Sequence, residues 1–322
     1  MQRAAVVVTG GAGYIGSHVA LFLYRKGYHV IILDDLSRGT LKPFWATCIP
    51  ADIAHEKVIA DIFRTTPITA VVHCAALTEN VRSSVKNPAD FYANNVSKTI
   101  RLLELMVDHD VRNFIFSSSS LVYGIPESLP VGESHPCKPI SPYGKTKYFI
   151  ESILHDFSQA YDFSFVSLRY FNVSGVIPEY AIDTNILFRT HSFISTLLRA
   201  IQLKKPLVVA GTDFGTPDGT SIDDYIHVWD VAQATYLALE HLHKDRPSDH
   251  FNIGSGVGYS VKQLISIIKN LVQEPSCTIV SGDKKCEVPP KIIADPSRAQ
   301  TILQWKPKCS SIEEIICSEM RL

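Results

Sequence analysis

Tyr143 and Lys147 are residues whose types and spacing suggest chemistry. They open a helical pattern over 142–160, where a four-residue step places both side chains on one face, one turn apart. A phenol has a pKa of about 10, so it acts as a base at neutral pH only beside a positive charge. Lys147 can supply that charge, and the pair therefore suggests a tyrosine general base. A helix face that carries both residues by chance is the alternative.

A glycine-rich stretch from Thr9 to Gly16 follows the apolar run 4–8 and precedes an amphipathic segment. A strand, a glycine turn and a helix in this order can hold a diphosphate on exposed N–H groups at the positive end of the helix dipole. The next apolar run ends at Asp34, 18 residues after Gly16. A carboxylate there can accept hydrogen bonds from ribose hydroxyls and favours NAD over its 2′-phosphorylated form. The stretch predicts NAD as the cofactor, with a glycine-rich surface turn as the alternative.

A run of serines, Ser117 to Ser120, follows the apolar residues Phe114-Ile115-Phe116. If this run ends a parallel strand, its hydroxyls lie at the carboxyl edge of the sheet, where one of them can hydrogen-bond a reacting oxygen. The alternative is a serine-rich turn whose hydroxyls form hydrogen bonds only with the backbone of that turn. Tyr143 and Lys147 favour the first interpretation.

The elements that must position these residues alternate along the first half of the chain. Apolar runs predict strands, and longer amphipathic patterns between them predict helices, which indicates a doubly wound parallel sheet of the Rossmann type with a smaller mixed α/β lid. The expected strands are 4–8, 29–33, 70–73, 113–117 and 165–170, and the expected helices are 15–26, 56–64, 88–109 and 142–160.

The alternation of strand and helix patterns ends after residue 172. We therefore expect an NAD-binding domain over 1–172 and a mainly substrate-binding domain over 173–322, with some later segments rejoining the first domain. Helical patterns there cover 193–203, 228–242 and 260–273, with a strand-like piece at 207–210. In such sheets the ligand lies across the carboxyl ends of the strands, so the cleft is expected between the two parts.

Composition excludes several classes of partner. The 322 residues are 46% apolar, and 31 basic against 32 acidic residues give a net charge of −1, so nucleic acid is not expected. The seven cysteines are scattered without metal-ligand spacing, which fits a reducing cytoplasm and predicts no metal site. The apolar runs are too short to span a bilayer, so we expect no membrane association.

Together these motifs resemble the extended short-chain dehydrogenase/reductase superfamily and, within it, the NAD-dependent epimerase/dehydratase family, closest to enzymes that invert C4 of nucleotide sugars. The resemblance implies a retained NAD, interconversion of UDP-glucose and UDP-galactose by transient oxidation at C4, and a homodimer formed through the helices 88–109 and 142–160. The matching phrases cover nearly the whole chain in order: Val8 to His18, Val30 to Asp34, Asn94 to Val96, Asn113 to Ser119, Val122 to Gly124, Ser141 to Lys145, Leu168 to Asn172, Asp218 to Thr220 and Asp224 to Val228.

The resemblance also implies roles residue by residue. Tyr143 would take the proton of the sugar 4-hydroxyl, Ser119 would steady the keto intermediate, and Lys147 would complete the catalytic set. The implied NAD contacts are Gly10, Gly13, Tyr14, Ile15, Gly16, Asp34, Asp35, Leu36, Ser37, Asp52, Ile53, Cys74, Ala75, Ala76, Asn95, Tyr143, Lys147 and Phe171. The implied substrate contacts are Ser119, Tyr143, Asn172, His191, Asp223, Lys285 and Ile292.

The sequence departs from the family's pattern where the nucleotide is gripped. Asp223 stands where the family has an arginine that reaches the diphosphate, and Lys285 replaces a second arginine. A lysine supplies charge without a bidentate fork. Val288 stands where the family has a ribose-binding aspartate, Leu121 replaces a threonine, and Thr78-Glu79-Asn80 replaces an expected lysine with one inserted residue.

Four other functions are alternatives to this one. Nucleotide-sugar dehydratases and decarboxylases need acidic residues just after the serine strand, and Ser120-Leu121 supplies none. A 4-epimerase of another nucleotide sugar, N-acetylated or a uronic acid, stays open because of Asp223 and Val288, and Ile292 occupies the position where the family gates sugar size. A regulatory protein that only binds a dinucleotide also stays open, although it would need neither Tyr143 nor Lys147.

Overall fold

The structure is a computed structural model that describes residues 4–38, 43–78, 81–177, 192–209, 211–272, 278–281 and 288–320. Its largest element is a seven-stranded sheet in which all neighbouring strands run parallel. In sheet order the strands are β10 (Asp249–Ile253), β6 (Ser164–Tyr170), β5 (Asn113–Ser119), β4 (Ile68–His73), β1 (Ala5–Thr9), β2 (His29–Asp34) and β3 (Thr47–Pro50).

This order confirms the predicted doubly wound parallel sheet. The chain proceeds outward from β1 through β2 to β3, then returns to β4 on the other side of β1. The carboxyl ends of β1 and β4 are therefore the point where the strand order reverses, which is where open sheets of this class bind ligands. The glycine turn follows β1, and Cys74 follows β4.

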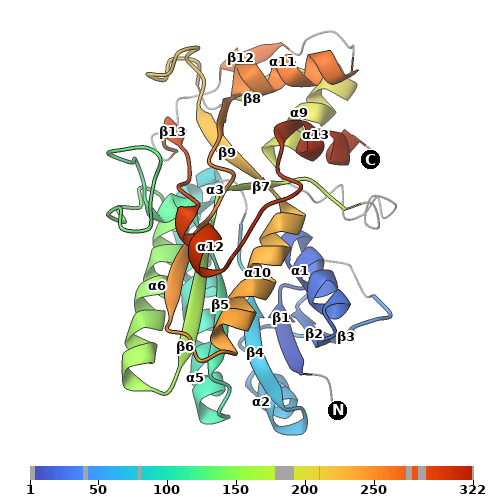
Figure 1. The fold of residues 1–322 in the computed structure, drawn as a ribbon, viewed down its shortest axis with the longest axis vertical. Coiled ribbons are helices and arrows are strands. Elements are labelled where there is room, and N and C mark those ends of the chain that lie inside the picture. Colours follow the sequence, from blue (N-terminus) through green and yellow to red (C-terminus); the bar gives the residue numbers. More distant parts are fainter. Residues whose placement is uncertain are drawn as a thin grey trace.

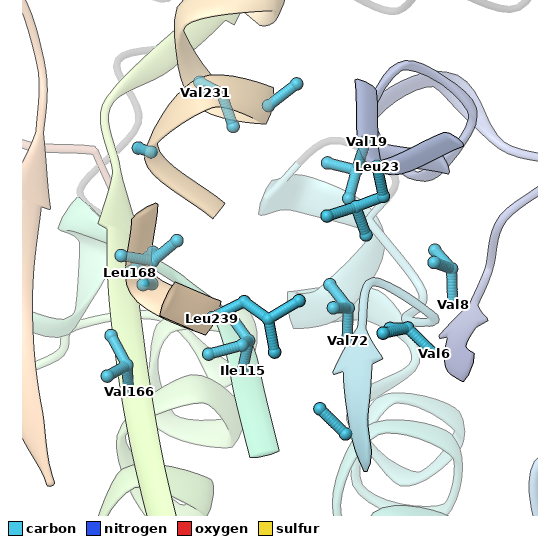
Figure 2. Close-up of a cluster of buried hydrophobic side chains, with 14 of the residues drawn as sticks. Val6, Val8, Val19, Leu23, Val72, Ile115, Val166, Leu168, Val231 and Leu239 are labelled. Carbon is cyan, nitrogen blue, oxygen red and sulfur yellow. The ribbon is translucent and has the colours of Figure 1, made fainter. Parts of the chain in front are cut away.

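Helices cover both faces of the sheet because the buried strands alternate their side chains between the two faces. Val6 and Val8 pack with α1 (Tyr14–Arg25) and α10 (Val228–Leu242), which lie side by side (Figures 1 and 2). Val7 faces the other way, into a cluster with α2 (Glu56–Thr65), α5 (Lys98–Asp108) and α6 (Pro142–Ala160).

The single helix expected over 88–109 is wrong, because the structure breaks it into three parts. These are α4 (Pro88–Tyr92), a π-helical stretch (Ala93–Ser97) and α5, with the short helix α3 (Val81–Lys86) before them. Asn95 lies in the π-helical stretch, and its side chain bonds the loop after β4 instead of facing solvent. Widened turns of this kind are frequent at functional sites.

Two elements late in the chain pack with the large sheet. The strand β10 pairs with β6 at the sheet edge, and α10 packs on α1. The sequence analysis had predicted neither β10 nor β3. Both are short strands at the two edges of the sheet.

The rest of the second half forms two small sheets and a separate core. A four-stranded sheet contains β7 (Asn172–Ser174), β9 (Ile222–His227), β11 (Gly258–Ser260) and β13 (Lys291–Ile292), and lies beside the carboxyl edge of the large sheet (Figure 1). Beyond it, at the top of Figure 1, α9, α11 and α13 gather around the two-stranded sheet of β8 and β12. The remaining bounds are β8 (Leu207–Val209), β12 (Ile279–Ser281), α9 (Phe193–Gln202), α11 (Val261–Val272), α12 (Ser297–Ile302) and α13 (Ile312–Met320).

The predicted strand-like piece 207–210 corresponds to β8, and residue 210 lies outside the described residues, as does residue 273 of the predicted helix 260–273. Within the described part of the chain, none of the helices combines the length and the apolar character needed to cross a membrane.

Candidate active site

The turn between β1 and α1 requires glycine at two positions. Gly10 has a φ of +64°, and a Cβ there would lie 2.6 Å from the backbone nitrogen of Ala75. A Cβ at Gly16 would lie 2.1 Å from the carbonyl oxygen of Gly10. Gly13 is the N-cap of α1 and has extended backbone. Among the described residues, no side chain caps α1 at Gly13 and the first turn of the helix holds no acidic residue, which suits a site for a diphosphate.

The carboxylate of Asp34 ties the end of β2 to this turn. It accepts hydrogen bonds from the backbone N–H of Ala12 at 3.0 Å and of Leu36 at 2.8 Å. Burial raises the pKa of Asp34, and the two N–H groups oppose that rise. Each carboxylate oxygen has a second lone pair, so Asp34 can also accept from a ribose hydroxyl. Asp35 binds Ser37 in the loop that follows.

The loop after β4 lies against the glycine turn. The backbone N–H of Cys74 donates to the carbonyl oxygen of Thr9 at 3.1 Å, and that of Ala75 donates to its hydroxyl at 3.3 Å. Asn95 holds the loop from the other side, because its amide accepts from the N–H of Leu77 at 2.7 Å and donates to the Leu77 carbonyl at 3.1 Å. Ala76 lies between these two anchors.

Asp52 and Ile53 follow β3 at the edge of the same surface. Asp52 forms an ion pair with Lys98 of α5 and accepts from the N–H of Ala54 at 2.8 Å, while Ile53 is buried under the sheet. Asp52 therefore has a structural partner in addition to its predicted cofactor contact.

Tyr143 and Lys147 lie at the start of α6 and face the end of β5. Lys147 is buried, and its Nζ lies 5.8 Å from the centre of the Tyr143 ring. Burial lowers the pKa of Lys147 to about 8, and the neighbouring Cys74 and Glu151 oppose that change. Burial raises the pKa of Tyr143 to about 12, opposed by a hydrogen bond with Ser119. The three predicted catalytic residues thus meet at the carboxyl edge of the sheet.

Three of the predicted substrate residues come together on the small sheet. Asp223 of β9 pairs in register with Ile292 of β13, and Asn172 of β7 pairs with Tyr225 of β9. Ile292 is buried in one cluster with Phe171, next to the turn that follows Ser119. Burial and the adjacent Asp224 raise the pKa of Asp223 to about 6.

Of the other four predicted substrate residues, Ser119 and Tyr143 belong to the predicted catalytic set described above, and His191 and Lys285 lie outside the described residues. The sequence also predicts that the cations able to neutralise a diphosphate near Asp223 are Lys284, Lys285, Arg189 and Arg199. Lys284 and Arg189 lie outside the described residues as well. Arg199 is described, on α9.

Comparison with known proteins identifies the family. The model of the NAD dependent epimerase/dehydratase family matches residues 6–254, from β1 to the residue after β10. The chain belongs to this family. It shares 41% identity over 313 residues, 97% of this chain and 93% of the relative, with the UDP-glucose 4-epimerase of Halalkalibacterium halodurans.

Solved structures of family members have the same architecture. UDP-glucose 4-epimerase from Brucella ovis in complex with NAD aligns with a TM-score of 0.88 at 36% identity, over 98% of this chain and 97% of that one. The Bifidobacterium longum enzyme in complex with NAD⁺ and UDP aligns with a TM-score of 0.88 at 31% identity, over 99% and 97%. The fold, the cofactor and the enzyme class predicted from the sequence are therefore confirmed at the level of the family.

The sequence analysis missed three buried polar residues of this family member. His73 at the end of β4 bonds Thr9 at 2.8 Å and Thr99 at 3.1 Å, and burial lowers its pKa to about 3, so it is neutral. Glu151 and Arg169 form a buried ion pair behind the predicted catalytic residues. Two signals in the sequence could have revealed this pair. Arg169 is a charged residue within an apolar strand, and Glu151 is an acid four residues after Lys147 on the same helix.

Proposed function

We propose that the protein is an NAD-dependent UDP-glucose 4-epimerase, which interconverts UDP-glucose and UDP-galactose by transient oxidation at C4. The observation that carries the proposal is the meeting of Tyr143, Lys147 and Ser119 beside the glycine turn of an NAD-dependent family. Full-length similarity to enzymes named UDP-glucose 4-epimerase supports the choice of substrate.

The cofactor is held along the carboxyl edge of the large sheet. The glycine turn and the N–H groups of Tyr14 and Ile15 receive the diphosphate, and Asp34 accepts from the adenosine ribose. The contacts proposed at this edge are Gly10, Gly13, Tyr14, Ile15, Gly16, Asp34, Asp35, Leu36, Ser37, Asp52, Ile53, Cys74, Ala75, Ala76, Asn95, Tyr143, Lys147 and Phe171. When bound, NAD⁺ supplies the acceptor for the hydride from C4 and a positive charge beside the phenol.

Tyr143 moves the proton. Because burial raises the pKa of Tyr143 to about 12, the phenol needs more positive charge nearby before it can act as a base at neutral pH. Lys147 contributes an ammonium one helical turn away. Tyr143 then takes the proton of the sugar 4-hydroxyl as C4 is oxidised, and Ser119 donates a hydrogen bond that steadies the resulting 4-keto oxygen.

The reverse transfer completes the epimerisation. The 4-keto sugar turns over within the site, C4 is reduced on its opposite face, and Tyr143 returns the proton to the oxygen. The sugar must rotate while the nucleotide stays bound, so binding energy has to lie on the UDP part of the substrate. We assign that part to the lid, which is the segment after residue 172 without α10 and β10, together with Asn172 at its border. The proposed contacts are Asn172, His191, Asp223, Lys285 and Ile292.

A second candidate substrate is another nucleotide sugar, N-acetylated or a uronic acid. This candidate stays open because Asp223, next to Asp224, and Val288 stand where the family has residues that hold the nucleotide of UDP-glucose, so the substrate site departs from that pattern. A carboxylate at that point repels phosphate. The catalytic set would serve either substrate, because only the lid distinguishes them.

A homodimer is part of the proposal. Phe149 of α6 is 42% exposed and stacks on Tyr92 of α4, with ring centroids 6.1 Å apart. An aromatic pair on two adjacent helices, with Phe149 exposed and Tyr92 partly buried, suits a self-complementary contact with a second copy. We also assign the protein to the cytoplasm, since the five described cysteines are all free.

The test is a direct assay. Purified protein should convert UDP-galactose to UDP-glucose without added cofactor and release NAD on denaturation, whereas Tyr143→Phe should not turn over. Conversion of UDP-N-acetylglucosamine or UDP-glucuronate, with none of UDP-galactose, would replace the first substrate by the second candidate. Absence of turnover with all three would contradict the epimerase proposal.

A further inference from the structure

A buried ion pair lies directly behind the proposed catalytic residues. Nη2 of Arg169 on β6 donates to Oε2 of Glu151 on α6 at 2.7 Å, and Nε donates to Oε1 at 3.0 Å. Glu151 is 3% exposed and Arg169 is 4% exposed. Burying two charges costs several kcal/mol of desolvation per ion, so a pair of this kind is a weak source of stability. A role in specifying geometry would account for its presence.

Glu151 holds the strand on one side of Ser119. It follows Lys147 by four residues and therefore lies on the same face of α6, one turn further along. Its Oε1 also accepts a hydrogen bond of 2.6 Å from the hydroxyl of Ser118. Ser118 directly precedes Ser119, so the end of β5 is tied to the helix that carries Tyr143.

Arg169 holds the chain on the other side of Ser119. Ser119 begins the short 3₁₀ turn Ser120–Val122, and Tyr123 follows that turn. Nη1 of Arg169 donates to the Tyr123 hydroxyl at 2.9 Å, and this hydroxyl donates to Oδ1 of Asn252 at 2.7 Å. All of these side chains are buried. The residues before and after the catalytic turn are thus attached to the same ion pair.

We propose that Glu151 and Arg169 are positioning residues, which set the place of the Ser119 hydroxyl relative to the Tyr143 phenol through Ser118 and Tyr123. Glu151 and Tyr143 share one helix, so a carboxylate that binds Ser118 fixes that helix against β5. A third tether, from Nζ of Lys147 to the carbonyl oxygen of Ser117 at 2.7 Å, acts in the same direction. This inference rests on the proposed function of the Ser119, Tyr143 and Lys147 set.

The charge of Glu151 also acts on Lys147. Burial lowers the pKa of Lys147, and Glu151 opposes that change. Arg169 balances the carboxylate, so the pair adds little net charge beside the phenol. Geometry is therefore the main contribution expected of the pair.

Ser118→Ala is the cleanest test because it removes one link without changing any charge. We expect kcat to fall by about ten- to a hundredfold, since small misplacements of catalytic groups have effects of this size. KM and NAD content should not change. The hydrogen bond from Ser119 lowers the pKa of Tyr143. Loss of that contact should therefore raise this pKa, so that Tyr143 ionises at a higher pH than in the wild type.

Ser167→Ala is the matched control. Ser167 lies on the neighbouring strand β6, is fully buried, and its hydroxyl has no hydrogen-bond partner among the described residues. This variant should keep the wild-type kcat and Tyr143 ionisation. Wild-type values of both quantities in Ser118→Ala would overturn the inference, as would an equal loss in the two serine variants.

Tyr123→Phe tests the second link independently. It should lower kcat without raising KM, and the double variant with Ser118→Ala should lose more activity than either single variant. A merely structural role would lower Tm but leave the kcat of the folded protein and the Tyr143 titration unchanged, which would overturn the inference.

The titration follows Tyr143 by the near-ultraviolet difference spectrum between each protein and its Tyr143→Phe counterpart, and it needs no turnover. An inactive wild-type protein would therefore contradict the proposed function alone, while the shift of the Tyr143 titration would still decide the positioning role.

Discussion

Nζ of Lys147 donates a hydrogen bond of 2.7 Å to the carbonyl oxygen of Ser117, which fixes the ammonium group between α6 and the end of β5. The nitrogen also lies 4.9 Å from the centre of the Phe116 ring, within the range of a cation–π contact. These contacts within the protein hold in place the positive charge that a tyrosine base needs.

Replacing Tyr143 by Phe should remove turnover and leave NAD bound, because only the proton acceptor is lost. We expect kcat to fall by at least ~10²–10⁴-fold, the usual contribution of a general base. Steady-state kinetics with UDP-galactose and assay of released NAD check both parts. Tyr161→Phe, at the exposed end of α6, is the control and should keep full activity. Near-full activity of Tyr143→Phe would show that the catalytic assignment is wrong.

Gly16→Ala should abolish NAD retention. The added Cβ would lie 2.1 Å from the carbonyl oxygen of Gly10, so the turn between β1 and α1 has to open. Gly215→Ala is the control, since a Cβ there meets no atom within 4 Å. Absorbance of the released cofactor after denaturation measures retention. Equal NAD content in the two variants would contradict the assignment of the turn to the diphosphate.

Asp223→Arg should lower KM for UDP-galactose. The change removes a repulsive carboxyl group and adds a guanidinium fork that suits phosphate, which could strengthen binding by ~1–3 kcal/mol. Asp223→Asn, which only removes the charge, should give part of that gain. If Asp223→Arg weakens UDP-galactose binding, and the unmodified protein binds another nucleotide sugar tightly, Asp223 is a specificity residue for that second substrate.

Glu319→Gln should change the pH dependence of stability. Burial raises the pKa of Glu319 from 4.5 to about 7, so the folded protein holds more protons than the unfolded chain between these values. The contribution of Glu319 to the free energy of unfolding is therefore complete below pH 4.5 and is lost as pH rises through about 7.

Denaturant unfolding of both proteins across this range measures the effect. The stability of the wild type relative to the variant should fall by about 3 kcal/mol, from 1.36 kcal/mol per pKa unit. Other carboxyl groups with a raised pKa are present in both proteins and cancel in the difference. The glutamine Oε1 can still accept from the N–H of Gly175 and from Ser192, which both bond Oε1 of Glu319. Parallel stability curves would rule out the raised pKa.

Phe149→Glu should convert a dimer into a monomer, because it places a charge within the aromatic pair with Tyr92. Light scattering of the wild type should give twice the chain mass, and the variant should give the chain mass. Val208 of β8 is 65% exposed and lies in the part of the molecule at the top of Figure 1. Val208→Glu is the control and should remain dimeric. A monomeric wild type would contradict the proposed assembly.

Local sequence patterns were enough to predict several features of this protein. The glycine turn before α1, the acid at the end of β2 and the helix over 142–160 follow from backbone sterics and side-chain periodicity within about 20 residues. Tyr143 and Lys147 face the same way because four residues make one helical turn. The alternation of strands and helices, in turn, fixed the class of the sheet.

Only the tertiary structure decided which distant segments meet. The pairing of β10 with β6, and of Asp223 with Ile292, joins strands far apart in the chain, and neither partner's local pattern specifies the other. The break in the helix over 88–109 follows from contacts of Asn95 with the loop after β4. The ion pair of Glu151 and Arg169 is likewise long-range, because buried charges are tolerated only where the folded chain supplies each with a partner.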